Sequence, residues 1–92
     1  MPISSNTAGT VSGAGILPSN QAPGASPYTY TNANAYVEDI LIAVGTVTAV
    51  DFSRDGATWY ATGVIAGSAR LSPNDRLKVT YTVAPTITRV PR

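Results

Sequence analysis

The sequence predicts an all-β fold: a small antiparallel sandwich or barrel of six to seven short strands with an extended N-terminal arm. Runs rich in Val, Thr, Ile and Tyr recur between residues 28 and 90, and turn-forming residues separate them. No stretch shows helical periodicity with caps. The 92 residues suffice for one domain, so we assign residues 1–27 to the arm and residues 28–92 to the β domain.

Residues 1–27 have the composition of an arm. They consist mostly of Gly, Ser, Ala, Pro, Asn and Thr, and the first charged side chain of the chain is Glu38. The apolar residues of the arm are too few for a core and are candidate contacts to a partner: Ile3, Val11, Ile16 and Leu17. We expect the arm to lie along a neighbouring subunit, and a flexible linker or tail is the alternative.

The first strands of the domain are predicted in residues 28–53. Residues 28–32 alternate aromatic and β-branched side chains, which favours a short strand. Residues 36–44 are apolar on both faces, which is typical of a central or interface strand, and the pattern places Val44 on the face of Ile40 and Ile42. After Gly45, residues 46–53 resume as a strand. Val50 and Phe52 are expected on one side of it, with Val47 and Ala49 on the other.

A hairpin is predicted around the dipeptide Asp55-Gly56, which tolerates the positive φ angles of a tight turn. The return strand is expected in residues 59–62. Residues 63–68, with two glycines, predict a loop or irregular edge segment, and residues 70–75 a Pro/Asn/Asp turn. Residues 77–83 alternate apolar and polar side chains as a strand with one wet face does, and residues 86–90 follow as a short last strand.

A β domain of this size has a small core, and without Cys or His it has no disulfide or zinc site to support that core. We therefore expect an oligomer or a subunit bound to another protein. The candidate subunit contacts are aromatic: Tyr28, Tyr30, Tyr36 and Trp59.

Catalysis finds little support in the sequence. The absence of Cys and His removes thiol and imidazole chemistry. Glu38 and Asp39 are neighbours in a strand, so they point to opposite faces, and we expect them to solvate the strand rather than to act as an acid–base pair. Asp51 and Asp55 flank Ser53 without the spacing of a calcium loop. A role for Asp55 in the turn is favoured over a cation site or a salt bridge to Arg54. We predict a protein that is not an enzyme and has no cofactor and no metal.

Charge and hydropathy bear on the partners. The net charge of +1 argues against binding to nucleic acid, and no apolar run reaches the length of a membrane span, so we predict no nucleic acid and no membrane as partners. No signal peptide is recognisable. The basic residues near the C-terminus are expected to form a solvated sheet face or a dock for an acidic protein: Arg70, Arg76, Lys78, Arg89 and Arg92.

Four stretches carry a resemblance: residues 18–23 (PSNQAP), residues 28–32 (YTYTN), residues 45–56 from Gly-Thr-Val to Ser-Arg-Asp-Gly, and residues 71–81 (LSPNDRLKVTY). In these stretches the sequence resembles small structural proteins of tailed-bacteriophage virions, of the capsid decoration (cement) or head-fibre type. The resemblance implies a homotrimer on the capsid surface that binds the major capsid protein. Its arms would clamp adjacent coat subunits and stabilise the head. It also implies a virion protein made in the host cytoplasm without a signal peptide.

Two alternatives stay open. The first is a head-fibre or tail-fibre adaptor, in which the arm joins another part of the particle. The second is a small carbohydrate-binding β module that uses Trp59 and Tyr60 at the hairpin.

Overall fold

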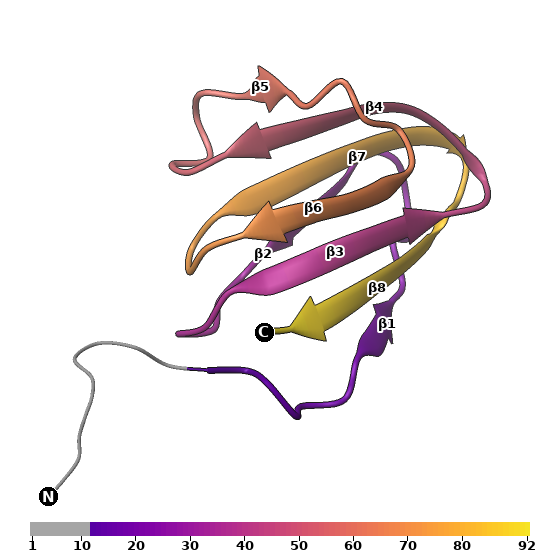
Figure 1. The fold of residues 1–92 in the computed structure, drawn as a ribbon. Coiled ribbons are helices and arrows are strands. Elements are labelled where there is room, and N and C mark those ends of the chain that lie inside the picture. Colours follow the sequence, from indigo (N-terminus) through magenta and orange to yellow (C-terminus); the bar gives the residue numbers. More distant parts are fainter. Residues whose placement is uncertain (1–11) are drawn as a thin grey trace, which may run out of the picture.

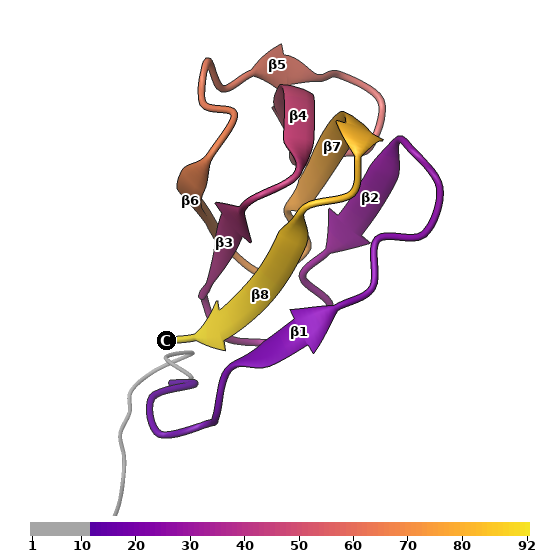
Figure 2. The same cartoon turned by 90° about the vertical axis from the view of Figure 1, so that its right-hand side faces the viewer.

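The structure is a computed structural model that describes residues 12–92, and in this range the chain is all-β. Eight strands follow one another along the chain: β1 (Ser19–Gln21), β2 (Tyr28–Thr31), β3 (Glu38–Ala43), β4 (Thr46–Ser53), β5 (Tyr60–Ala61), β6 (Gly67–Leu71), β7 (Arg76–Val83) and β8 (Thr86–Pro91) (Figure 1). They form two antiparallel sheets of four strands, in the orders β1-β8-β3-β6 and β2-β7-β4-β5. Figure 2 shows these two layers lying against each other, so the predicted sandwich is confirmed.

The core lies between the two sheets and consists of apolar side chains that alternate along the strands. Its buried members are Ile40, Ile42, Val47, Val50, Leu71, Leu77, Val79, Tyr81 and Ile87. From Arg76 to Thr82 the outward residues of β7 are polar, as the alternation predicted, whereas Val83 at the end of the strand was expected inward and is exposed. Strand β4 departs from the predicted pattern. Val47 and Val50 are both buried, because an irregularity in the pairing of β4 with β7 between Val47 and Ala49 shifts the alternation by one residue.

Two strands lie where the sequence predicted none. β6 occupies part of the expected loop and turn, and it forms because β3 offers it a partner from Glu38 to Ile42. β1 lies within the expected arm and pairs with β8, Ser19 opposite Arg89. The sandwich therefore begins earlier in the chain than residue 28.

The part of the arm that the structure describes is hydrogen-bonded to the β domain. After β1, the hydroxyl of Ser26 accepts the Tyr81 amide at 2.9 Å, and the Tyr81 hydroxyl donates to the Gly24 carbonyl. Residues 19–27 thus carry the chain from the edge of one sheet to the edge of the other, where β2 begins. The candidate arm contacts Ile3 and Val11 lie outside the described residues.

Val44 was expected in the strand, on the same face as Ile40 and Ile42, and that expectation is wrong. β3 ends at Ala43, and Val44 and Gly45 form the turn that carries the chain to β4 in the other sheet. Both residues have positive φ angles, 57° and 66°. A Cβ atom at Gly45 would lie 2.6 Å from the Val83 carbonyl oxygen, so this turn requires glycine there. The Val44 side chain is consequently turned to the surface, 74% exposed.

Candidate functional site

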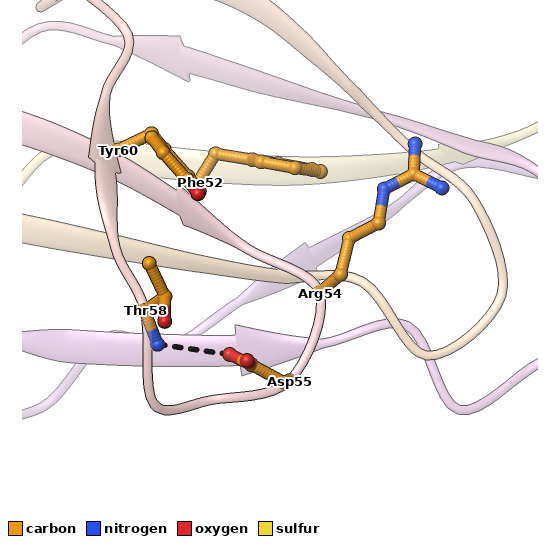
Figure 3. A pocket seen from close by; sticks show the side chains of 5 residues that line it. All are labelled: Phe52, Arg54, Asp55, Thr58 and Tyr60. Carbon is orange, nitrogen blue, oxygen red and sulfur yellow. Dashed lines mark hydrogen bonds between the residues drawn. The ribbon is translucent and has the colours of Figure 1, made fainter.

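The β4–β5 hairpin contains a small hollow lined by Asp55, whose carboxylate already accepts hydrogen bonds from the same chain. The Oδ1 atom of Asp55 accepts a hydrogen bond from the Thr58 amide at 2.9 Å (Figure 3). The same oxygen accepts the Ala57 amide at 2.8 Å and the Ser53 hydroxyl at 3.0 Å. The Thr58 and Ala57 amides, with that hydroxyl, lower the pKa of Asp55 to about 2. The predicted hairpin and the turn role of Asp55 are confirmed, since this carboxylate accepts donors as an Asx turn does. Arg54 pairs with Asp75 instead, at 3.6 Å.

The open side of this hollow is aromatic. Its volume is about 290 Å³, and Phe52, Arg54 and Tyr60 complete the lining. Tyr60 is 64% exposed. Trp59 belongs to another surface, because its ring lies 4.4 Å from the Lys78 ammonium. Trp59 and Tyr60 therefore do not form one continuous stacking platform.

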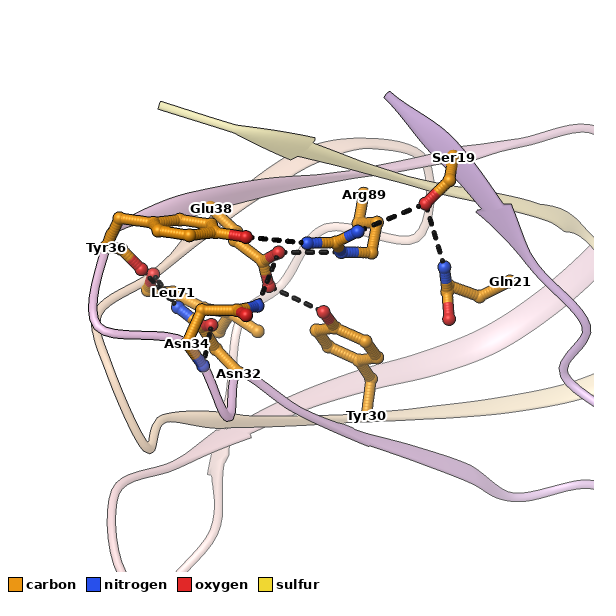
Figure 4. Close-up of polar contacts among 9 residues, drawn as sticks. All are labelled: Ser19, Gln21, Tyr30, Asn32, Asn34, Tyr36, Glu38, Leu71 and Arg89. Atoms are coloured by element: carbon orange, nitrogen blue, oxygen red, sulfur yellow. Dashed lines mark hydrogen bonds and ion pairs between the residues drawn. The ribbon is translucent and has the colours of Figure 1, made fainter. Parts of the chain in front are cut away.

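A polar cluster centred on Glu38 lies at the same end of the sandwich as the hairpin tip, at the start of β3 in the other sheet (Figure 4). Strand alternation turns Glu38 to the same side as Ile40 and Ile42, where it is completely buried. Its Oε1 accepts the Tyr30 hydroxyl at 2.5 Å. Its Oε2 accepts Arg89 Nε at 2.7 Å and Asn34 Nδ2 at 3.1 Å. The expectation of a solvated Glu38 is wrong, because an arginine, a phenol and an amide replace water around this carboxylate.

Arg89 joins this cluster to β1. Its Nη1 donates to Ser19 Oγ at 3.2 Å and its Nη2 to Tyr36 Oη at 3.1 Å. Burial raises the pKa of Tyr30 far above its usual range, and the hydrogen bond and charge of Glu38 raise it further. Tyr30 is thereby kept as a hydrogen-bond donor. The cluster fastens the edge strand to the core and leaves the Glu38 carboxylate no path to a substrate.

Asn32 holds the adjacent turn. It is completely buried, and its Nδ2 donates to the carbonyls of Tyr36 at 2.8 Å and Leu71 at 3.1 Å. Its Oδ1 accepts the Asn34 amide at 3.0 Å. The segment between β2 and β3 is thereby tied to the end of β6.

Asp39 points to the opposite face, as strand alternation requires. Its two oxygens accept Arg70 Nε at 2.9 Å and Arg92 Nε at 2.8 Å. The hydrogen bond from Arg70 is the largest cause that holds the pKa of Asp39 below its usual value, and Arg92 adds to it. Arg70, Arg89 and Arg92 are thus paired within the chain, which leaves a smaller basic surface than the sequence indicated.

The four aromatic candidates do not gather at one surface. Tyr28 and Tyr30 pack against the core, Tyr36 supports Arg89, and Trp59 covers Lys78. Sequence reasoning treated them as a set because aromatic side chains are frequent at interfaces, whereas the strand register distributes them.

The arm residues Ile16 and Leu17 lie on a loop that is fixed at both ends. Before them, Gly13 is buried, and its amide donates to the Arg92 carbonyl at 2.5 Å. The Ile16 amide closes a turn on the Gly13 carbonyl at 3.1 Å, and β1 begins two residues after Leu17. Both side chains are exposed, Leu17 by 82%. We call residues 13–17 the N-terminal loop.

A groove with no charged residue runs along the edge of β4. One hollow of about 360 Å³ is lined by Val44, Gly45, Thr46, Val47, Ile65 and Ala66. A second of about 170 Å³ continues it, lined by Thr48, Ala49, Val50, Ala61, Gly63, Val64 and Ile65. β5 covers β4 only at Asp51 and Phe52, which leaves the edge from Thr46 to Ala49 paired with β7 alone. We call this feature the β4 groove.

Within residues 12–92, no three Asp or Glu side chains gather as metal ligands would. A helix of the length and hydropathy that a membrane crossing needs does not occur in that range. Comparison with protein-family models, with curated proteins and with solved structures gave no match to this chain.

Proposed function

We propose that the chain is a non-catalytic virion structural protein, a capsid decoration subunit that binds coat subunits on the outside of a phage head and stabilises the shell. This proposal rests on one observation: acidic side chains are bonded within the chain, whereas apolar side chains face solvent. The carboxylates Glu38, Asp39 and Asp55 are engaged by donors of the same chain, whereas apolar side chains stand exposed on the N-terminal loop and along the β4 groove. Such a surface suits protein contact better than turnover of a substrate.

The resemblance in residues 18–81 supports the same class of protein, and the sandwich is compatible with it. Under this proposal the uncharged arm reaches a neighbouring coat subunit, with Ile3 and Val11 as its contacts. The mechanism is linkage: a ligand that binds only the assembled shell stabilises it by about 2.7 kcal/mol per site at a concentration 100 times its Kd.

The test is co-sedimentation of the purified protein with empty coat-protein shells of the virus that encodes it. We expect saturable binding to assembled shells, weak binding to unassembled coat protein, and a higher temperature of shell disruption. Because β1 pairs with β8, deleting residues 1–27 would remove a strand. A double substitution, Ile3→Asp with Val11→Asp, is therefore the better probe of the arm. Thr29→Asp, on the exposed side of β2, is its control. Absence of shell binding by the unmodified chain would refute the proposal.

One observation favours a second candidate function, carbohydrate binding. Tyr60 is exposed beside the hairpin hollow, where its ring and the largely exposed Arg54 side chain face solvent. A glycan array with Tyr60→Ala as control tests it. Glycan binding that Tyr60→Ala abolishes, without shell binding, would favour this alternative.

A further inference from the structure

We propose that the N-terminal loop of one copy docks into the β4 groove of a second copy, with Leu17 as the inserted side chain. This inference rests on the self-association included in the proposed function, and it names the two surfaces that make the contact. It assigns Ile16 and Leu17 to another copy of the chain rather than to the coat.

The groove has the chemistry for an apolar, uncharged guest. Its walls, residues 44–50 and 61–66, contain no Lys, Arg, Asp or Glu. Val44, Val64 and Ile65 on these walls are exposed. A charged segment would lose its hydration there without finding a partner, so the groove selects against one.

The backbone at Val44 supports a role for this surface. A β-branched residue with φ of 57° is strained, since its Cβ lies close to the neighbouring backbone, and Asn or Gly is the ordinary residue for such a position. Val44 gains no compensating burial within its own chain, because it is 74% exposed. Burial against a second chain would offset the strain.

The N-terminal loop has the form of a preorganised guest. Gly13 sits so tightly that an added Cβ would lie 2.7 Å from Pro91 Cβ and from the Tyr36 ring. The turn closed by Ile16, in which Gly15 has a φ of 88°, then presents Leu17 outward. A loop already held in shape loses little conformational entropy on docking.

The loop cannot fill the groove of its own chain. It is anchored at Pro91 and Arg92, and Pro91 lies opposite Glu38, the first residue of β3. Val44 follows the other end of β3, about 20 Å away for a strand of six residues. The contact therefore needs a second copy. Repeated head to tail, such a contact closes a ring or extends a filament. A closed ring of three copies would be the predicted homotrimer.

Light scattering across a range of concentrations tests the contact with three variants. Leu17→Asp and Ile65→Asp each change an exposed side chain, and both are expected to raise the dissociation constant of the assembly by roughly tenfold or more. Val44→Asn relieves the strained turn, so we expect its melting temperature to rise by roughly 4–8 °C while its assembly weakens. Leu41→Asp, on the outer face of the other sheet, is the matched control and should assemble as the unmodified chain does.

Cross-linking then tests the pairing itself, because the chain has no native cysteine. With copper–phenanthroline as oxidant, a mixture of Leu17→Cys and Ile65→Cys should give a covalent dimer, and neither variant alone should. Leu17→Cys mixed with Leu41→Cys is the control. Four outcomes would overturn the inference: a chain that stays monomeric at every concentration, no cross-link in the mixture, equal cross-linking of Leu17→Cys alone, or unchanged assembly of Val44→Asn.

These outcomes are separable from a failure of the proposed function. If the chain is monomeric in solution yet binds shells, and its Leu17→Asp variant binds them normally, only the loop–groove contact is refuted. Self-assembly through loop and groove without any shell binding would refute the decoration role alone.

Discussion

Replacing Glu38 by glutamine tests whether the buried polar cluster holds the sandwich closed. The substitution conserves size and removes the charge. Glutamine has one oxygen where Glu38 has two, and that oxygen is best turned toward Arg89 and Asn34, which both donate to Oε2. Its NH₂ group then faces the Tyr30 hydroxyl, which has to accept instead of donate.

The cost is that of one charge-assisted hydrogen bond and a weakened ion pair, about 2 kcal/mol. It stays below the full penalty for an uncompensated buried charge, because the Arg89 side chain is 19% exposed and keeps Ser19 and Tyr36 as partners. Glu38→Ala leaves all three donors without an acceptor and should cost about 3–5 kcal/mol. For a domain of this size, 2 kcal/mol corresponds to a fall in melting temperature of roughly 8–16 °C.

Urea denaturation followed by the fluorescence of Trp59, the single tryptophan, measures these changes. The control is Asp39→Asn, one residue along the same strand. Its arginine partners are more than half exposed, so we expect a loss of about 1 kcal/mol or less. A double variant, Glu38→Gln with Arg89→Met, should recover part of the loss, since no buried charge then lacks its partner. Equal stability of Glu38→Gln and the unmodified chain would refute this account of the cluster.

Three further predictions concern the turns and the loop. Asn32→Ala removes the side-chain donor from the carbonyls of Tyr36 and Leu71, the second of these bonds being buried, and should cost about 2–4 kcal/mol, measured by urea denaturation. A loss below 0.5 kcal/mol, as is common for surface substitutions, contradicts it. Because the folded-state pKa of Asp55 is depressed to about 2, its stabilisation is complete above its unfolded value near 4 and is lost as the pH falls toward 2. Asp55→Asn should flatten the dependence of the urea midpoint on pH in that window, and an unchanged slope would count against the turn assignment. Gly13→Ala should release the N-terminal loop without unfolding the sandwich, because the added Cβ has no room there. The measurement is hydrogen exchange of the residue 13 amide, which should become faster. Unchanged exchange would show that the close packing at Gly13 does not hold the loop.

Residues with strong local signals could be predicted from the sequence. Asp55-Gly56 specified its turn through its own backbone and carboxylate, and Leu77, Val79 and Tyr81 turned inward as alternation required. β1 and β6 could not be found in this way. Their residues, Ser-Asn-Gln and Gly-Ser-Ala-Arg-Leu, have little β propensity and become strands only because β8 and β3 offer them hydrogen-bonding edges.

Burial of Glu38 was open to prediction, because its position two residues before Ile40 places it on the inward face. What the sequence did not show was its partner, since Arg89 lies 51 residues further along the chain. The β4 groove was missed for a related reason: its two walls meet only through the arrangement of the sheets, and a strained turn exposes Val44 where alternation would bury it.

The position of β8 inside its sheet sets the order in which the molecule can form during synthesis. β8 is made after every other strand of the sandwich, yet it lies between β1 and β3 and pairs with both. Until residues 86–91 have left the ribosome, β1 has no neighbour, and Glu38 has no arginine beside it. The first sheet therefore closes only in a late step of folding, and a nascent chain interrupted before Thr86 retains an exposed β3 edge that invites pairing with other chains.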